Sequence, residues 1–369
     1  MINPLYEKLA KLVVEYSLKI KKDQRVMIKG PIIAKDLIQA IYIEIIKEGA
    51  HPWLNVEVEG IKEIFLKHTS EEQLLYVDNL EKQAVKEFDR FISIHADYNT
   101  RKFSMISPKT IAMYGGAPDR KELNNIFEDR FFKGELKWVI IPFPCNSLAQ
   151  EANMDLFSYT QFVEKALLLD KDDPVEEWEK IKKEQDRIVD YLNKIEKIHV
   201  IGEDTDLTLS VKGRTWTNCC GTENLPDGEV FTGPVEDSVN GHIRFTFPGI
   251  YAGNEIENIY LEFKDGEVIN ATADKGEELL KEILKIDGAT RLGEFAVGTN
   301  YGITQFTKNM LFDEKIGGTL HSALGLGFKK TGSKNECAIH WDILKDMKLP
   351  GSQIFADDKL IYEEGKWKI

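Results

Sequence analysis

Hydrophobic side chains recur every three or four residues along several stretches of the first half of the chain. The first of these contains Leu5, Leu9, Leu12 and Tyr16, which line one side of an amphipathic helix. This spacing predicts helices over residues 4–20, 34–48, 70–86 and 119–132. Short apolar runs alternate with these stretches and predict strands at residues 25–29, 53–58, 91–95 and 138–142.

This alternation of strand and helix is typical of βαβ units, which build a parallel sheet with helices on both faces. We therefore predict an α/β domain with a parallel sheet. The first strand is followed by Gly30-Pro31 and not by a Gly-x-Gly-x-x-Gly loop, so the sequence gives no support for nucleotide binding.

The second half has a different pattern. A charged helix over residues 174–197, with Pro174 in its first turn, is a plausible connector. Beyond it, short alternating runs predict strands, and Lys264-Asp-Gly-Glu267 predicts a hairpin turn. A single clear helix is predicted near residues 275–285. We expect an α/β domain over residues 1–185 and an α+β domain with antiparallel strands over residues 186–369.

Composition excludes several classes of protein. The 369 residues contain 48 Lys and Arg against 62 Asp and Glu, a net charge of −14, which argues against a broad nucleic-acid or membrane-surface contact. No run approaches the roughly 18 apolar residues of a membrane helix, and the amino-terminal segment does not resemble a signal peptide. Only four cysteines are present, which favours a reduced, cytoplasmic protein in which they are small buried side chains.

The segment Ala338-Ile-His-Trp-Asp-Ile-Leu344 holds the most informative histidine of the chain. On a strand, residues two apart point to the same face, so His340 and Asp342 project together and Trp341 projects to the other side. This pair suits two ligands of one metal site. A hydrogen-bonded structural pair is the alternative interpretation.

Other candidate ligands lie in the same half. Glu314 and His321 are seven residues apart, so a helix would place them on one face. The intervening Gly317-Gly318 would be costly in a helix and would suit a close approach of the backbone to a metal site or a neighbouring chain. Glu229 and Glu294 stand in apolar runs, where a buried carboxylate must be paired, protonated or metal-bound, although each would also fit an edge strand.

Together these carboxylates and histidines, all within residues 229–342, are the ligand mix of a dinuclear hydrolytic site. Imidazole and carboxylate ligands suit zinc, cobalt or manganese. The sequence lacks the His-Glu-x-x-His helix of common zinc proteases and the Gly-x-Ser-x-Gly turn of serine hydrolases.

At these same residues the chain resembles the aminopeptidase T (AmpS-type) family of thermophilic metalloaminopeptidases. The resemblance covers essentially the whole chain. Its blocks are Asn224–Thr232, Gly288–Ala296, Leu311–Glu314, His321–Gly325 and His340–Asp342. It implies an exopeptidase that removes amino-terminal residues from short peptides and works as a homodimer with an internal cavity.

The resemblance also implies two divalent metal ions, with zinc, cobalt, manganese and magnesium all open. By motif, its metal ligands fall on Glu229, Glu294, Glu314, His321, His340 and Asp342. Glu314 would be a ligand or the catalytic general base that accepts a proton from the attacking water, with Glu229 as the second choice for the base.

Two positions depart from the family pattern. Phe328 stands where the family carries a tyrosine, and the loss of such a hydroxyl donor to an oxyanion can cost roughly 100- to 1000-fold in rate. Lys315 follows Glu314 where the family has asparagine, and it would be either a replacement electrophile or a surface residue. A hydrolase of another small amide and a metal-stabilised dimeric binding protein without turnover therefore remain as alternatives.

Overall fold

The computed structural model describes residues 3–369, which form two compact units. Among the described residues, the first unit comprises residues 3–177 with 221–225, and the second comprises residues 178–220 with 226–369. None of the described helices has both the length and the apolar composition needed to cross a membrane. The domain boundary expected between residues 185 and 186 stays a prediction.

The first unit is built on the predicted parallel sheet. Its strands lie in the order β2-β1-β3-β4, and all neighbours are parallel. The strands are β1 (Arg25–Pro31), β2 (His51–Glu57), β3 (Arg90–His95) and β4 (Lys137–Pro142). The prediction of a parallel α/β region in the first half is confirmed.

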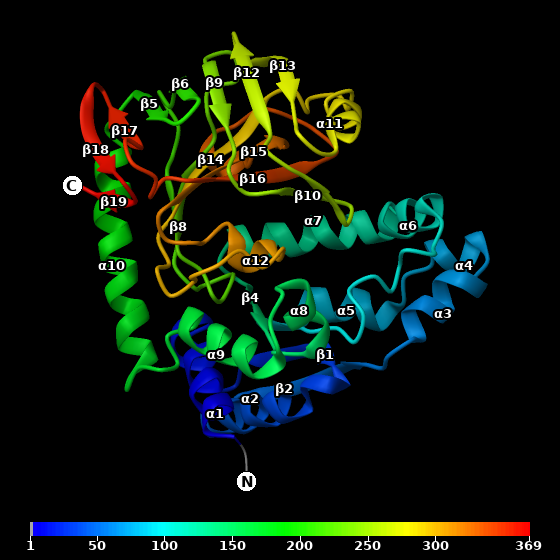
Figure 1. The fold of residues 1–369 in the computed structure, drawn as a ribbon. Coiled ribbons are helices and arrows are strands. Elements are labelled where there is room, and N and C mark those ends of the chain that lie inside the picture. Colours follow the sequence, from blue (N-terminus) through cyan, green and yellow to red (C-terminus); the bar gives the residue numbers. More distant parts are fainter. Residues whose placement is uncertain (1–2) are drawn as a thin grey trace. The chain divides into compact units, whose positions relative to one another are not determined.

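Helices lie on both sides of this sheet, with α1 and α2 on one side and α5 and α7 on the other (Figure 1). Phe91 of β3 and Trp138 of β4 are neighbours in the sheet, and they pack against Phe127 and Phe131 of α7, respectively. The helices are α1 (Pro4–Lys11), α2 (Lys35–Lys47), α3 (Ile61–His68), α4 (Glu71–Leu75), α5 (Asn79–Glu87), α6 (Pro108–Gly115), α7 (Pro118–Phe132), α8 (Asn146–Glu151) and α9 (Leu156–Ala166).

One predicted helix, over residues 70–86, is interrupted in the structure. Ser70 forms a capping box that begins α4, and Asp78 caps a new helix, α5, by accepting a hydrogen bond from the backbone of Leu80. A second N-cap inside a periodic stretch ends one helix and starts another, and periodicity does not detect it.

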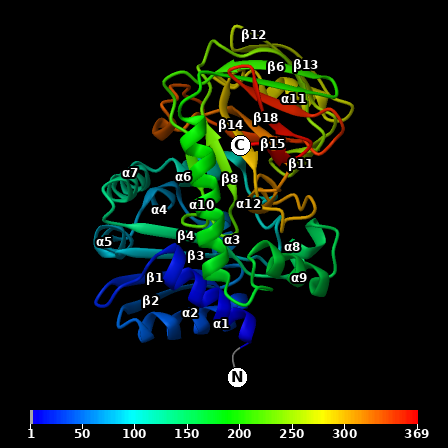
Figure 2. The same cartoon turned by 90° about the vertical axis from the view of Figure 1, so that its left-hand side faces the viewer.

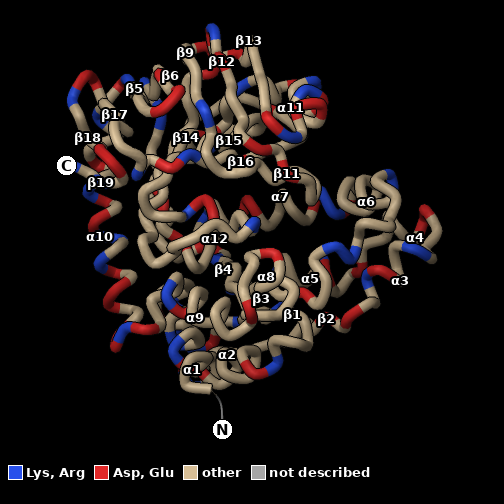
Figure 3. The backbone as a smooth tube through the Cα atoms, in the orientation of Figure 1, with Lys and Arg blue, Asp and Glu red and all other residues tan. Residues whose placement is uncertain are grey.

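The second unit begins within α10 (Pro174–Leu192), whose surface alternates acidic and basic side chains along its length (Figure 3). An eight-stranded sheet has the order β13-β12-β9-β6-β5-β17-β18-β19, with antiparallel pairing throughout. Its strands are β5 (Lys197–Gly202), β6 (Thr205–Ser210), β9 (Asn240–Arg244), β12 (Tyr260–Lys264), β13 (Glu267–Thr272), β17 (Gln353–Ala356), β18 (Lys359–Glu363) and β19 (Lys366–Trp367).

A second, five-stranded antiparallel sheet carries the candidate ligands. Its order is β16-β15-β14-β8-β7. The strands are β7 (Thr217–Cys219), β8 (Glu229–Thr232), β14 (Leu292–Gly298), β15 (Thr319–Gly325) and β16 (His340–Asp346). A small hairpin of β10 (Gly249–Tyr251) and β11 (Asn254–Ile256) and the helices α11 (Glu277–Ile283) and α12 (Met310–Asp313) complete the unit.

The two sheets of the second unit enclose one hydrophobic core. Side chains from one face of each sheet contribute to it, including Leu207 and Ile243 from the larger sheet and Phe295 and Ile343 from the smaller one. The prediction of an antiparallel α+β region in the second half, including the hairpin at Lys264–Glu267, is confirmed.

Candidate metal centre

Successive side chains along each strand of the five-stranded sheet point to opposite faces, so one face packs in the core and the other carries the candidate ligands. On β16, Trp341 and Ile343 lie in the core, whereas His340 and Asp342 point to the opposite face. The indole Nε1 of Trp341 donates to the carbonyl of Ile250 and fixes this strand. The same face carries Glu229 of β8, Glu294 of β14 and His321 of β15, each almost fully buried.

A β-bulge aims Glu294 at this face. Leu292 and Glu294 are two residues apart and would share a face in a regular strand, yet Leu292 lies in the core. The pairing with β15 shifts between these residues, so Gly293 is an extra residue that turns the strand over. A methyl group at Gly293 would lie 2.3 Å from the carbonyl oxygen of Leu326, so this position requires glycine.

Glu294 stands between the two histidines. Its Oε1 lies 3.6 Å from Nε2 of His321, and its Oε2 lies 3.1 Å from Nε2 of His340. On the far side of His321, the same Nε2 lies 3.2 Å from Oε2 of Glu229. On the far side of His340, Nε2 lies 3.5 Å from Oδ1 of Asp342. The two oxygens of one carboxylate thus face two different ligand groups, as in a carboxylate that bridges two metals.

The side chains form overlapping groups in which all potential ligand atoms lie within 4.8 Å of one another. The groups on this face are Glu229–Glu294–His321, Glu294–His340–Asp342 and Glu314–His321–Asp342. Every candidate ligand from the sequence is therefore a member of at least one group, although the residues come from separate strands and a loop.

Glu314 and His321 reach the site without a common helix, in line with the cost of Gly317-Gly318 in a helix interior. Glu314 directly follows the short helix α12, and His321 lies in β15. The chain between them turns at Gly318, whose φ of +89° favours glycine. The expected close approach at Gly317 is to Tyr301, since a methyl group at Gly317 would lie 2.6 Å from the ring.

The charges of this cluster strongly shift the pKa values of its acidic and basic side chains. Burial would lower the pKa of both histidines, but the surrounding carboxylates outweigh burial and raise it to about 10 for His321 and about 11 for His340. Burial would raise the pKa of Glu229, yet Lys315 and His321 lower it to about 2. Burial and the charges of Glu229 and Asp342 outweigh Lys315 and raise the pKa of Glu314 to about 8. The carboxylates therefore stabilise a positive charge at this site, as the raised pKa values of the two histidines show.

Several buried atoms here fit a bound metal. Within the described part of the chain, Oε2 of Glu229, Nδ1 of His321 and Oδ1 of Asp342 are buried without a hydrogen-bond partner. Nδ1 of His340 lies 2.7 Å from the carbonyl oxygen of Leu326 and donates its proton there, so Nε2, which faces the carboxylates, is the nitrogen that a metal would take in exchange for a proton. Orphaned oxygens beside an oriented imidazole are the donor set that divalent metals bind.

Helix α10 supports the strand that carries Glu229. The side-chain amide of Gln185 donates to the carbonyls of Glu229, at 2.8 Å, and Cys219, at 3.0 Å. Figure 2 shows α10 running beside β8. The buried amide thus holds β7 and β8 at the depth where Glu229 meets His321.

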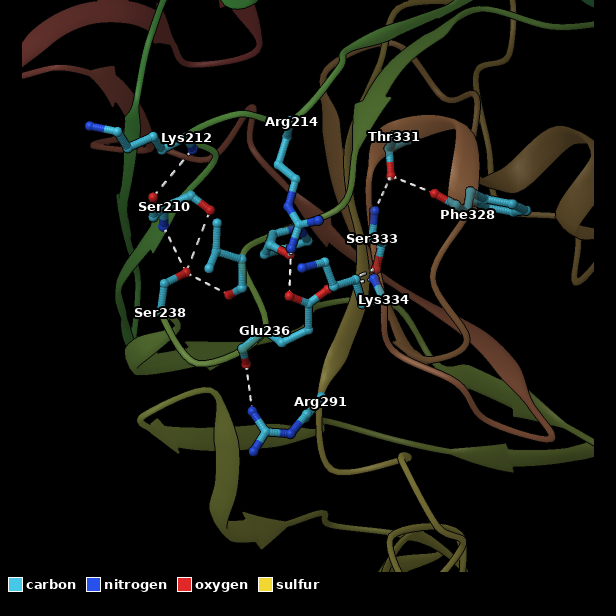
Figure 4. Close-up of polar contacts among 12 residues, drawn as sticks. Ser210, Lys212, Arg214, Glu236, Ser238, Arg291, Phe328, Thr331, Ser333 and Lys334 are labelled. Atoms are coloured by element: carbon cyan, nitrogen blue, oxygen red, sulfur yellow. Dashed lines mark hydrogen bonds and ion pairs between the residues drawn. The ribbon is translucent and has the colours of Figure 1, made fainter.

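The loop between β15 and β16, residues 326–339, brings Phe328 against the site. Its ring centroid lies 4.8 Å from that of His340. Glu236 anchors the loop from behind by accepting hydrogen bonds from the backbone of Lys334 and from Arg214, both at 2.6 Å (Figure 4). Burial would raise the pKa of Glu236, but these two partners outweigh it and lower the pKa.

Sequence reasoning missed the buried position of Lys315. Of the two alternatives for Lys315, a replacement electrophile or a surface residue, the surface position is wrong, because the residue is fully buried and its ammonium lies 3.1 Å from Oε1 of Glu229. It also overlooked Asp227 and Cys219, which form a further ligand-capable group with Glu229. Asp227 belongs to the Asn224–Thr232 block and was detectable there as one more acid in an apolar run.

Two large cavities lie away from the candidate metal centre. Cavities of about 540 and 560 Å³ lie in the first unit, at the carboxyl ends of its strands and between the sheet and helices α5 and α7. None of the ligand-capable groups found among residues 3–369 contributes to their linings. The converging ligands, and not the volume, identify the candidate active site.

The chain is similar to known metallopeptidases over its full length. A family profile described as thermophilic metalloprotease (M29) matches residues 3–367. Aminopeptidase 2 of Geobacillus stearothermophilus is 28% identical over 98% of this chain and 97% of its own length. Aminopeptidase AmpS of Bacillus subtilis is 29% identical over 97% of both chains. The structure of wild-type AmpT from Thermus thermophilus superposes with a TM-score of 0.84 at 23% identity over 99% of each chain, which shows a shared fold.

Proposed function

This chain belongs to the thermophilic metalloprotease (M29) family, and from that premise we propose how its second unit cleaves peptides. The protein is a metal-dependent aminopeptidase, a hydrolase that removes amino-terminal residues. We propose that it binds two divalent ions through Glu229, Glu294, Glu314, His321, His340 and Asp342. The observation that carries this proposal is the position of Glu294, whose two oxygens face His321 and His340 separately.

Two of the three ligand groups on this face, which share Glu294, would each hold one ion. Glu229 and His321 would complete one site, His340 and Asp342 the other, and Glu294 would bridge them. Bound metals would supply a Lewis acid for the scissile carbonyl, a water of lowered pKa and an anchor for the free amine of the peptide. Zinc, cobalt, manganese and magnesium all suit oxygen and imidazole donors to some degree, so their relative affinity must be measured.

Glu314 is our candidate for the general base. Its side chain is 19% exposed, whereas those of Glu229 and Glu294 are 6% and 5% exposed, so Glu314 is the most accessible of these acids to water and substrate. Lys315 holds its Oε1. The positive charge of bound metal ions would lower the pKa of Glu314 from about 8 and ionise the group, so that its Oε2 can accept a proton from the attacking water and pass it to the departing amine. Glu229 is the less accessible second choice.

Hydrolysis of the chromogenic substrate Leu-p-nitroanilide tests the proposed aminopeptidase activity. We expect the metal-loaded protein to release p-nitroaniline from this substrate and not from its N-acetylated form, because the free amine takes part in binding. Removal of metal by chelation should abolish turnover, and added metal should restore it. Cleavage of the acetylated substrate would indicate a different amidase, and no cleavage by the fully loaded protein would indicate a binding protein.

Substrate length, assembly and location complete the proposal. We propose short peptides as substrates, a homodimer as the working form and a cytoplasmic location. Assembly and substrate length are supported by the family resemblance. Location is supported by the four cysteines, all of which are free thiols.

A further inference from the structure

Lys315 is an unusual residue for the interior of a protein. It directly follows α12, and its side chain is completely buried. Its backbone is fixed at both ends, since its N–H donates to Phe312 and its carbonyl accepts from Asn300, both at 3.0 Å. Lysine is almost never fully buried unless it is paired, because the ammonium loses its hydration. The surroundings of this ammonium must therefore compensate its charge.

Acidic side chains supply that compensation. Nζ of Lys315 lies 3.1 Å from Oε1 of Glu229 and 4.0 Å from Oδ1 of Asp227, and it also contacts Oε1 of Glu314. The ammonium is therefore sealed inside the protein, behind the carboxylates that border the candidate metal centre. Because it has no exposed surface, it does not serve as an electrophile that touches the substrate.

The position of this ammonium coincides with a possible metal site. Cys219, Asp227 and Glu229 place three potential ligand atoms within 4.8 Å of one another, and all three residues are buried. A thiolate with two carboxylates is a ligand set that zinc or cobalt would accept. Lys315 contacts two of these three residues, and an ammonium and a divalent ion repel each other strongly at such distances in a buried site.

The contacts also divide the two oxygens of Glu229. Oε1 faces Lys315, whereas Oε2 faces His321 at 3.2 Å and has no hydrogen-bond partner among the described residues. Only Oε2 is therefore available to a metal on the histidine side. A bidentate Glu229, or one that bridged toward Cys219, would require the ammonium to move.

We infer that Lys315 is a positioning residue whose ammonium occupies the Cys219–Asp227–Glu229 group in place of a metal ion. It thereby confines the divalent ions to the histidine side and makes Glu229 a one-oxygen ligand. This inference rests on the proposed function only in taking Glu229 and His321 as metal ligands. It assigns the group around Cys219 a role that excludes metal.

Cobalt provides the test, because a cobalt–thiolate bond gives an intense near-ultraviolet charge-transfer band that oxygen and imidazole ligands do not give. The wild type, Lys315→Met, Lys315→Arg and the double variant Lys315→Met/Cys219→Ser are loaded with cobalt and freed of excess. Bound cobalt is then counted by elemental analysis, and each spectrum is recorded. Circular dichroism and a melting curve establish that each variant is folded.

We expect Lys315→Met to bind one more cobalt ion per chain than the wild type and to show the thiolate band. Lys315→Arg keeps the positive charge, so it should match the wild type in both measurements. The double variant should lose the band, which would assign it to Cys219. A purely structural lysine would change the melting temperature without adding an ion or a band.

The inference is overturned if folded Lys315→Met binds no additional cobalt and shows no band, or if the wild type itself shows the band. Should Lys315→Met not fold, Lys315→Gln replaces it, since an uncharged amide still donates to Glu229. A wild type that binds no cobalt at all would instead refute the proposed function. The two failures are therefore distinguishable.

Discussion

Replacing Phe328 by tyrosine restores a hydroxyl that the family resemblance leads us to expect beside the metal centre. The ring of Phe328 lies 4.8 Å from that of His340 and 5.5 Å from that of Phe231. Its carbonyl accepts hydrogen bonds from the backbone and side chain of Thr331, so the ring is presented from a fixed turn. A hydroxyl added at Phe328 would therefore occupy a defined place near the candidate metal centre.

The structure decides between the competing effects of this hydroxyl. Phe328 is 38% exposed, so the new group can reach water and the penalty of about 1–3 kcal/mol for an unpaired buried hydroxyl does not apply. The other candidate donor, Lys315, is sealed from the substrate. With Lys315 excluded as the donor, the hydroxyl should stabilise the oxyanion and leave substrate binding unchanged. We expect kcat to rise about 10- to 100-fold, which corresponds to about 1.4–2.7 kcal/mol.

Steady-state kinetics on Leu-p-nitroanilide measure the effect, with equal metal content of both proteins established by elemental analysis. KM and the melting temperature should stay close to wild-type values. Phe328→Leu is the matched control, because it alters the same position without adding a donor and should not raise kcat. An unchanged kcat in a fully loaded Phe328→Tyr protein would refute the missing-donor argument. A lowered melting temperature would show that the ring is enclosed in the working assembly.

Further predictions concern metal, pH and assembly. His340→Ala, Asp342→Ala and Glu229→Gln should each lower metal stoichiometry, because each removes a converging donor; full occupancy in all three after dialysis would show that the ligands are misassigned. Chelation should lower the melting temperature as well as activity, since an ion bound only to the folded state stabilises it; identical melting curves would count against this. Glu236→Gln should destabilise the protein by roughly 1–3 kcal/mol at neutral pH through loss of a charged hydrogen-bond partner. Because the folded state lowers the pKa of Glu236, its contribution is present above the usual glutamate pKa and is lost as the pH falls through the lowered pKa of the folded state, so the difference between the two melting temperatures should shrink progressively below about pH 4; a difference that does not shrink with falling pH would contradict the assignment. Sedimentation should give twice the chain mass of 42.2 kDa, and a single-chain mass at all concentrations would exclude the dimer.

Local pattern in the sequence determined much of this fold. Alternating strand and helix periods predicted the parallel sheet, and the spacing of His340 and Asp342 placed both on one face of a strand because side chains alternate with a period of two. Glu229 and Glu294 stood out since a carboxylate in an apolar run needs a partner. These features depend only on residues close together in the chain, which is why they can be read from it.

Tertiary structure decided what brings these residues together. The order β16-β15-β14-β8 depends on hydrogen-bond pairing between distant segments, which no local pattern specifies. The bulge at Gly293 turns Glu294 from the core to the face of the candidate ligands, and it is visible only in the register with β15. The sequence left Lys315 open between a replacement electrophile and a surface residue, and only the convergence of Asp227, Glu229 and Glu314 in the fold stabilises its charge in the interior. Burial and pairing of charge are properties of the assembled fold, so the sequence named the candidate ligands and the tertiary structure determined their partners.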